Sequence, residues 1–168
     1  GGLENLKLTN TFDVVLLINV LEHLINPEKT INEIRNKLLE KGGVLVIDVP
    51  NEYNLLQKTA NIKLKLDEWW VAPPGHLNYF NYDSLKKLLE LNGFNFISAE
   101  ASFPLEMFLL FGDNYVKNSD IGGLCHSKRM NFEKTFDELN QFDKLIELYE
   151  SFAKIGIGRQ IRVYASKK

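Results

Sequence analysis

The sequence predicts an α/β fold in which helices cover a largely parallel sheet. Short apolar runs rich in β-branched residues occur near 13–18 and 44–49, a pattern typical of strands buried on both faces. Helical periodicity separates the two runs, so Phe12 to Asn51 reads as one strand–helix–strand unit. Such crossovers are right-handed, and both strands therefore end at the same edge of the sheet.

The helix of this unit has recognisable start and stop signals. Asn26 is a predicted N-cap, and Pro27 occupies the first helical position. Apolar residues follow at helical spacing up to Leu38, and Gly42–Gly43 is expected to end the helix in a left-handed turn.

The next part of the chain is a long connection followed by a second helix and strand. A short helix is expected within Leu55–Leu66. Asp83 or Ser84 is the predicted cap of a clear amphipathic helix that ends at Gly93, and a strand is predicted near 95–101.

The last third is predicted to be mostly helical, with a helical insertion near 103–153. We expect loop from Phe103 to Lys128, apart from a short apolar helix around 105–111. Aromatic and aliphatic residues recur at helical intervals from 132 to 152 and predict one long helix. A final strand is expected near 160–166.

Length and composition set broad limits on what the chain is. Its 168 residues, 45% hydrophobic and 25% charged, are expected to form a single domain, 1–168. A formal charge of −2 predicts no general attraction to nucleic acid or membrane. Cys125 is the single cysteine, and no leader or membrane span is recognisable, so we expect a cytoplasmic protein.

Four segments, in order, resemble the C-terminal part of a class I S-adenosylmethionine-dependent methyltransferase. They are FDVV…NVLEHL…P, GGVLVIDVPN, GHLNYFNYDSLKKLLELNGF and GIGRQIRVYASKK. The resemblance implies the second half of a Rossmann-like sheet, with the strands near 13–18, 44–49 and 95–101 parallel. The strand near 160–166 would be antiparallel and inserted between the second and third.

The resemblance implies S-adenosylmethionine as the cofactor, but one motif of the family is missing from the sequence. No strand followed by a glycine-rich turn precedes Phe12, although such a turn is where backbone approaches this cofactor. We therefore expect a partial methyltransferase domain that by itself binds cofactor weakly and is inactive. By resemblance, Leu3, Asn19, Val20 and Glu22 are the predicted cofactor-binding residues.

Histidines near the predicted sheet edge are the candidate catalytic residues. His23 follows the first strand, and His76 follows Pro-Pro-Gly on a rigid turn. An imidazole whose pKa lies near ~6.5 can act as general base toward a hydroxyl group. The competing interpretation is structural, with both histidines bracing loops.

Further candidates would bind substrate. Asn51 follows the second strand, while Trp69, Trp70 and Tyr79 come from the long connection. The two tryptophans could form a wall of the substrate pocket, or they could pin the connection to the sheet. Both interpretations stay open.

No metal site is expected from the sequence. Glu22 and His23 offer one carboxylate and one imidazole, too few for a dedicated protein site. His126 lies beside Cys125, but no second close pair of ligands accompanies them.

Two functions from different classes follow. The first is methyl transfer to a small molecule; a weak resemblance of GDNYV…CHSKRMNFE to surface-polysaccharide enzymes suggests a sugar or polysaccharide precursor. The second is a non-catalytic α/β module that pairs with another chain. A nicotinamide-dependent enzyme is disfavoured because its phosphate-binding turn is also missing. The apolar strand Val14 to Ile18 has no charge, proline or bulge to protect an edge, so a homodimer through this strand is also expected.

Overall fold

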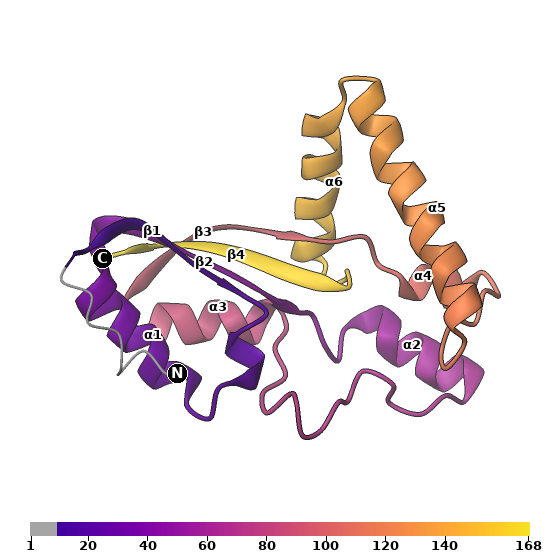
Figure 1. Cartoon of the computed structure of the whole chain (residues 1–168), viewed down its shortest axis with the longest axis horizontal. Coiled ribbons are helices and arrows are strands. Elements are labelled where there is room, and N and C mark those ends of the chain that lie inside the picture. Colours follow the sequence, from indigo (N-terminus) through magenta and orange to yellow (C-terminus); the bar gives the residue numbers. More distant parts are fainter. Residues whose placement is uncertain (1–9) are drawn as a thin grey trace.

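A computed structural model of the chain describes residues 10–168. Its centre is a four-stranded sheet in the order β1-β2-β4-β3, shown in Figure 1. The strands are β1 (Phe12–Ile18), β2 (Leu39–Pro50), β3 (Phe94–Ala101) and β4 (Gln160–Lys167). The helices are α1 (Pro27–Glu33), α2 (Leu55–Leu64), α3 (Tyr82–Leu91), α4 (Glu106–Leu110), α5 (Ser119–Glu138) and α6 (Phe142–Lys154).

The strand directions confirm the predicted topology. β1 and β2 are parallel, whereas β4 is antiparallel both to β2 and to β3. β3 therefore runs in the same direction as β1 and β2. β2 and β4 are the central strands, and their buried residues form the middle of the hydrophobic core with α1 and α3.

The helices lie on two sides of the sheet. α1 and α3 lie together on one side, and α5 and α6 form a hairpin that extends away on the other (Figure 1). Among residues 10–168, no helix is long and apolar enough to cross a membrane. The single-domain assignment and the separate status of the 103–153 region stay predictions.

The prediction that the first strand is buried on both faces is wrong. Leu17 of β1 is buried, but Val14, Leu16 and Ile18 are 52%, 59% and 49% exposed. Side chains alternate between the two faces of a strand. α1 and α3 cover one face, while within residues 10–168 no helix packs over the other face of β1.

The first helix is shorter than predicted. Asn26 caps it as expected, by accepting a hydrogen bond from the Lys29 N–H at 2.9 Å. However, α1 ends at Glu33, a π-helical turn (η3, Ile34–Leu38) follows, and β2 begins at Leu39. Gly42 is left-handed, with φ of +77°, but it lies in the irregular start of β2, where the pairing with β1 slips.

Two further predictions about helices need correction. Asn81, rather than Asp83 or Ser84, caps α3: its side chain accepts from the Ser84 N–H, and the Ser84 hydroxyl accepts from the Asn81 N–H. The expected single helix over 132–152 is two helices, separated at Asn140, whose φ is +54°. α5 also begins earlier than expected, because Asn118 caps it by accepting from the Ile121 N–H. The helices predicted within 55–66 and around 105–111 are confirmed.

Candidate functional site

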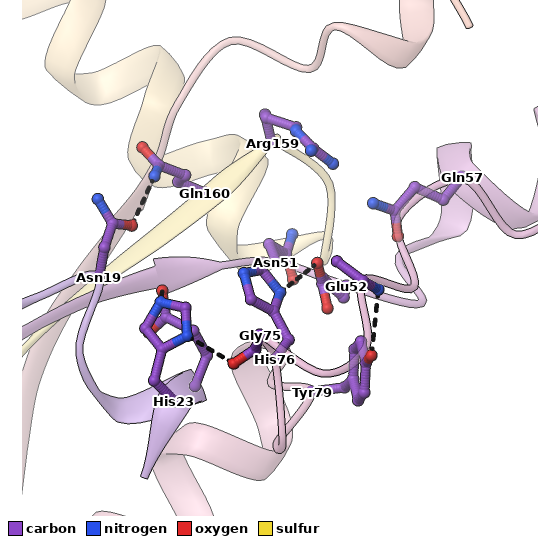
Figure 2. Close-up of polar contacts among 12 residues, drawn as sticks. Asn19, His23, Asn51, Glu52, Gln57, Gly75, His76, Tyr79, Arg159 and Gln160 are labelled. Carbon is purple, nitrogen blue, oxygen red and sulfur yellow. Dashed lines mark hydrogen bonds and ion pairs between the residues drawn. The ribbon is translucent and has the colours of Figure 1, made fainter. Parts of the chain in front are cut away.

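The predicted site residues gather where β1 and β2 end. Three segments meet there: the turn after β1, the start of the connection after β2, and the loop before α3 (Figure 2). Ligands of open α/β sheets bind at this carboxyl edge. Leu3 lies outside the described residues, so its predicted cofactor contact stays a prediction.

Asn19 makes the sharp turn at the end of β1. Its φ is +52°, a conformation that asparagine tolerates better than most residues. Its N–H donates to the Asp48 carbonyl oxygen at 2.8 Å, and its side-chain oxygen accepts from Gln160 Nε2 at 3.1 Å (Figure 2). Asn19 therefore connects three strands of the sheet. Val20, next along the chain, is partly exposed beside it.

Glu22 and His23 lie on a 3-10 turn, η2 (Leu21–His23), directly after this bend. Glu22 is only 2% exposed, and its Oε2 has no hydrogen-bond partner. His23 Nδ1 lies 2.7 Å from the Gly75 carbonyl oxygen. Because a carbonyl oxygen can only accept, Nδ1 carries the proton, and the other ring nitrogen, Nε2, lies 3.6 Å from Glu22 Oε1.

Backbone hydrogen bonds fasten the loop before α3 to this turn. The N–H groups of Leu77 and Asn78 both donate to the Glu22 carbonyl oxygen, at 2.9 and 3.0 Å. The Asn78 side chain adds a hydrogen bond to the Leu24 carbonyl oxygen at 2.6 Å. These contacts hold the His23 and His76 rings with their centroids 5.0 Å apart.

Glu52 is a site residue that the sequence places at this edge, after the second predicted strand, without assigning it a role. It is 2% exposed, and its Oε1 lies 3.6 Å from His76 Nδ1. Burial raises the pKa of the Glu52 carboxyl to about 7; the Arg159 guanidinium opposes this shift, and Glu22 adds to it. Its position directly after a buried strand is the sequence signal that places it here, and its pairing with His76 is the contact that the sequence does not record.

Asn51 lies beneath the surface of the site. It is fully buried, and its side-chain N–H donates to the Gly158 carbonyl oxygen at 3.0 Å. Asn54 donates to the same oxygen, at 3.3 Å. Asn51 thus joins the end of β2 to the start of β4. Its predicted contact with substrate stays a prediction, for which its unpartnered Oδ1 is the available atom.

Aromatic side chains form a continuous group next to His76. Trp69 and Trp70 meet edge-to-face at 4.7 Å, and Tyr53 contacts both Trp70, at 5.6 Å, and Tyr79, at 5.9 Å. Tyr79 in turn lies 6.3 Å from His76. Trp70 is buried and Trp69 half-buried, so the group can both pin the connection and border the histidines.

A second buried polar group lies farther along the same edge. Glu106 is fully buried, and its nearest cation is Arg159, at 3.8 Å between Oε1 and Nη1. Burial raises the pKa of the Glu106 carboxyl, while the Arg159 guanidinium acts against this rise. Among residues 10–168, neither carboxylate oxygen of Glu106 nor the nearby Nε2 of Gln57 has a hydrogen-bond partner. Nothing in the sequence around Glu106 or Gln57 indicated this group.

The other histidine and the cysteine lie away from this edge. Cys125 is buried on α5, and His126, next to it, contacts Arg129 on the same helix, with His126 Nδ1 3.4 Å from Arg129 Nη2. A separate cavity of about 720 Å³ lies between the α5–α6 hairpin and the sheet. Arg162 lines this cavity and forms ion pairs with Asp48, at 2.7 Å, and with Glu100, at 3.0 Å.

Comparison with known proteins identifies the class of protein that this fold and site define. Residues 4–99, more than half of the chain, match the family model of the methyltransferase domain. The chain therefore belongs to the methyltransferase domain family.

Solved structures show the same fold. A SAM-dependent methyltransferase from Archaeoglobus fulgidus superposes with a TM-score of 0.51 at 18% identity, over 94% of this chain and 60% of the other. A second from Thermotoga maritima gives a TM-score of 0.54 at 16% identity, over 100% of this chain and 62% of the other. At these identities the likeness shows the fold alone.

One curated relative is similar in sequence over a shorter stretch. It is an uncharacterised protein of Methanocaldococcus jannaschii, 41% identical over 64 residues, which are 32% of this chain and 28% of that protein. The chain thus spans less than two thirds of each of these relatives.

Proposed function

We propose that the chain provides the acceptor-activating part of an S-adenosylmethionine-dependent methyltransferase. The family membership and the fold support this proposal. The observation that carries it is the polar group Glu22, His23, Glu52 and His76 at the carboxyl edge, with the aromatic group beside it. In this chemistry the cofactor brings the reactive methyl group, and the protein aligns and activates the acceptor.

The roles of the residues follow from their places in the site. Asn19, Val20 and Glu22 would border the cofactor, together with Leu3. His23 and His76 would activate the acceptor, and the aromatic group with Asn51 would position it. A small molecule with a hydroxyl acceptor, such as a sugar or polysaccharide precursor, suits two imidazoles beside the half-buried indole of Trp69.

The test measures methyl transfer in the protein that contains this chain. Tritiated S-adenosylmethionine is supplied with a panel of sugars, sugar nucleotides and small amines, and the labelled products are separated. Transfer to a hydroxyl compound supports the proposal, and loss of this transfer in His76→Ala, but not in His126→Ala, assigns it to this site. A protein that transfers label to none of the panel, with or without His76, would contradict the assignment.

The second candidate is an interaction module that pairs with another chain. The exposed apolar side chains of β1 favour it. Such a module would tolerate His23→Ala and His76→Ala with no loss of function, whereas changes to β1 would abolish its pairing.

A further inference from the structure

Three of the site's side chains are arranged like the ligands of one metal ion. Glu22, His23 and His76 each offer one ligand atom, and these three atoms all lie within 4.8 Å of one another. His23 and His76 lie far apart in the sequence. They come together because hydrogen bonds fasten the loop before α3 to the turn after β1. The sequence prediction of no metal counted only Glu22 and His23 at this edge and did not include His76.

The outer contacts of both imidazoles suit metal ligation. His23 turns Nδ1 to the Gly75 carbonyl oxygen at 2.7 Å (Figure 2). His76 Nδ1 faces the Glu52 carboxylate at 3.6 Å from Oε1, close enough for an ion pair but too far for a hydrogen bond. Histidines that bind metals usually donate their other ring N–H to a carbonyl or carboxylate oxygen, which fixes the tautomer and the ring orientation. In His23 this leaves the Nε2 lone pair on the side of Glu22.

The carboxylate of the cluster is buried and lacks a hydrogen-bond partner for one oxygen. The Glu22 side chain is 3% exposed, and its Oε2 makes no hydrogen bond. Buried polar atoms are normally satisfied, and a buried carboxylate is costly unless it is paired or bound to a metal. The nearest partner of Glu22 is His23 at 3.6 Å, which is too long for a hydrogen bond.

We propose that Glu22, His23 and His76 bind one divalent transition-metal ion, while Gly75 and Glu52 orient the two imidazoles from outside. Two nitrogen donors and one oxygen donor favour zinc, iron, cobalt or manganese over magnesium or calcium, which prefer oxygen ligands. Such an ion would lower the pKa of an acceptor hydroxyl bound to it. Only this last consequence rests on the proposed function; metal binding itself does not.

The distances require only a small closure around the ion. Metal–ligand bonds of about 2.0–2.2 Å place the ligand atoms of a tetrahedral site about 3.5 Å apart. The His23–Glu22 pair is already at 3.6 Å, and the widest pair lies within 4.8 Å. Rotations of the partly exposed His23 and His76 side chains can supply this closure. The two loops stay together during such rotations, because the backbone N–H groups of Leu77 and Asn78 donate to the Glu22 carbonyl oxygen.

The histidine content of the chain makes a direct test straightforward. The chain has three histidines, two in the cluster and His126 on α5. Zinc chloride is titrated into the purified, metal-free protein, with calorimetry for affinity and stoichiometry and with ring ¹H–¹³C spectra for the site. We expect one zinc per chain, with the ring signals of His23 and His76 shifted and those of His126 unchanged.

Variants assign the ligands. His23→Ala, His76→Ala and Glu22→Gln should each weaken zinc affinity at least tenfold, and the matched control His126→Ala should leave it unchanged. Glu52→Gln removes an outer partner and should weaken affinity by ~10–100-fold. If a variant fails to fold, the ring spectra of the wild-type protein still show whether His23 and His76 bind the zinc ion. Magnesium chloride, titrated in parallel, should bind far more weakly.

Some outcomes would overturn the metal proposal. These are no zinc binding, binding that shifts the His126 ring, or an affinity unchanged in both His23→Ala and His76→Ala. The proposed function is tested separately. Methyl transfer that persists in a chelator, with no zinc bound, would refute the metal proposal and leave the proposed methyltransferase function standing. Stoichiometric zinc binding without methyl transfer to any acceptor would support the metal site and refute the proposed function.

Discussion

At the scale of single residues, His76 is the side chain on which the proposed function depends most. It contacts Glu52, faces His23 and borders Tyr79, so three groups orient one imidazole. We expect His76→Ala and His23→Ala to lower methyl transfer by ~10²–10⁴-fold, the usual contribution of proton transfer by a positioned side chain. The free energy of unfolding should fall by only about 1 kcal/mol, because each ring makes at most one hydrogen bond.

The measurement pairs initial rates with denaturant unfolding for the same variants. His126→Ala, on the exposed surface of α5, is the control and should change neither quantity. If both site variants keep full turnover, the two histidines brace loops and the acceptor is activated elsewhere.

Glu106 carries a second prediction at this scale, on stability against pH. Burial raises its pKa in the folded protein above the ordinary value of 4.5. As the pH rises above 4.5, the unfolded chain releases this proton first, so folding stability falls until the folded-state pKa is passed, by at most about 1.4 kcal/mol per pH unit. Glu106→Gln removes this dependence.

Unfolding in urea between pH 4 and pH 8 measures the effect. The stability advantage of Glu106→Gln over the wild type should grow as the pH rises. Glu138→Gln, on the exposed end of α5, serves as the control. An advantage of Glu106→Gln that is constant with pH would mean that Arg159 fully offsets the effect of burial on the pKa. A loss of stability that grows with pH would mean that Arg159 stabilises the ionised carboxylate more than burial disfavours it.

The sequence could predict part of this site because position after a buried strand is a local signal. Asn19, Glu22 and His23 were identified in that way, and His76 by its rigid turn. The pairing of His76 with Glu52, and the approach of His23 to Gly75, depend on how the long connection folds back. No periodicity or spacing records such contacts, so the pairing of Glu52 with His76 and the position of Arg159 beside Glu106 could not be predicted.

At the scale of elements, the caps decide where helices begin. Asn81 and Ser84 satisfy each other's backbone N–H groups at the start of α3. Asn81→Ala should therefore cost about 1 kcal/mol of stability. Asp83→Ala should cost less, since Asp83 interacts only with the helix dipole in the first turn. Thermal unfolding of both variants tests this; an equal or larger loss for Asp83→Ala would favour the cap expected from the sequence.

The α5–α6 hairpin shows why element boundaries were harder to predict than element types. Apolar residues continue at helical spacing from Phe132 to Phe152, so periodicity alone cannot reveal the break at Asn140. Likewise Gly122 and Gly123 weaken the helical pattern within Ser119–Glu138, although the Asn118 cap starts the helix before them. A single residue decides each boundary: Asn140 through its left-handed backbone, and Asn118 through its capping side chain.

At the scale of the whole molecule, the strand order and directions were predictable, because family resemblance supplied what periodicity could not. The burial of the first strand was not predictable, because an apolar run shows only that the side chains suit a core. It does not indicate which element covers them. Within residues 10–168, β1 pairs with β2 alone, so its other edge has no strand partner there. Residues 1–9 lie outside this description.

This edge leads to the last prediction, that the chain self-associates through β1. Three apolar side chains of β1, Val14, Leu16 and Ile18, are about half exposed, and natural edges are normally protected by charge or proline. Pairing with a second copy would satisfy the edge backbone groups and bury apolar surface, at ~25 cal/mol per Å². Leu16→Lys should shift the protein toward monomer without loss of folding stability, because a lysine there can reach solvent.

Size-exclusion chromatography with light scattering at several concentrations measures the association, and hydrogen exchange locates it. Ile62→Lys, which changes an exposed apolar side chain on α2 in the same way, is the matched control and should leave the association unchanged. Protected amides from Val14 to Ile18 in the associated form would place β1 at the interface. A stable monomer at every concentration, with rapidly exchanging amides in this strand, would mean that the β1 edge stays unpaired; protected amides in a monomer would mean that another part of the chain covers it.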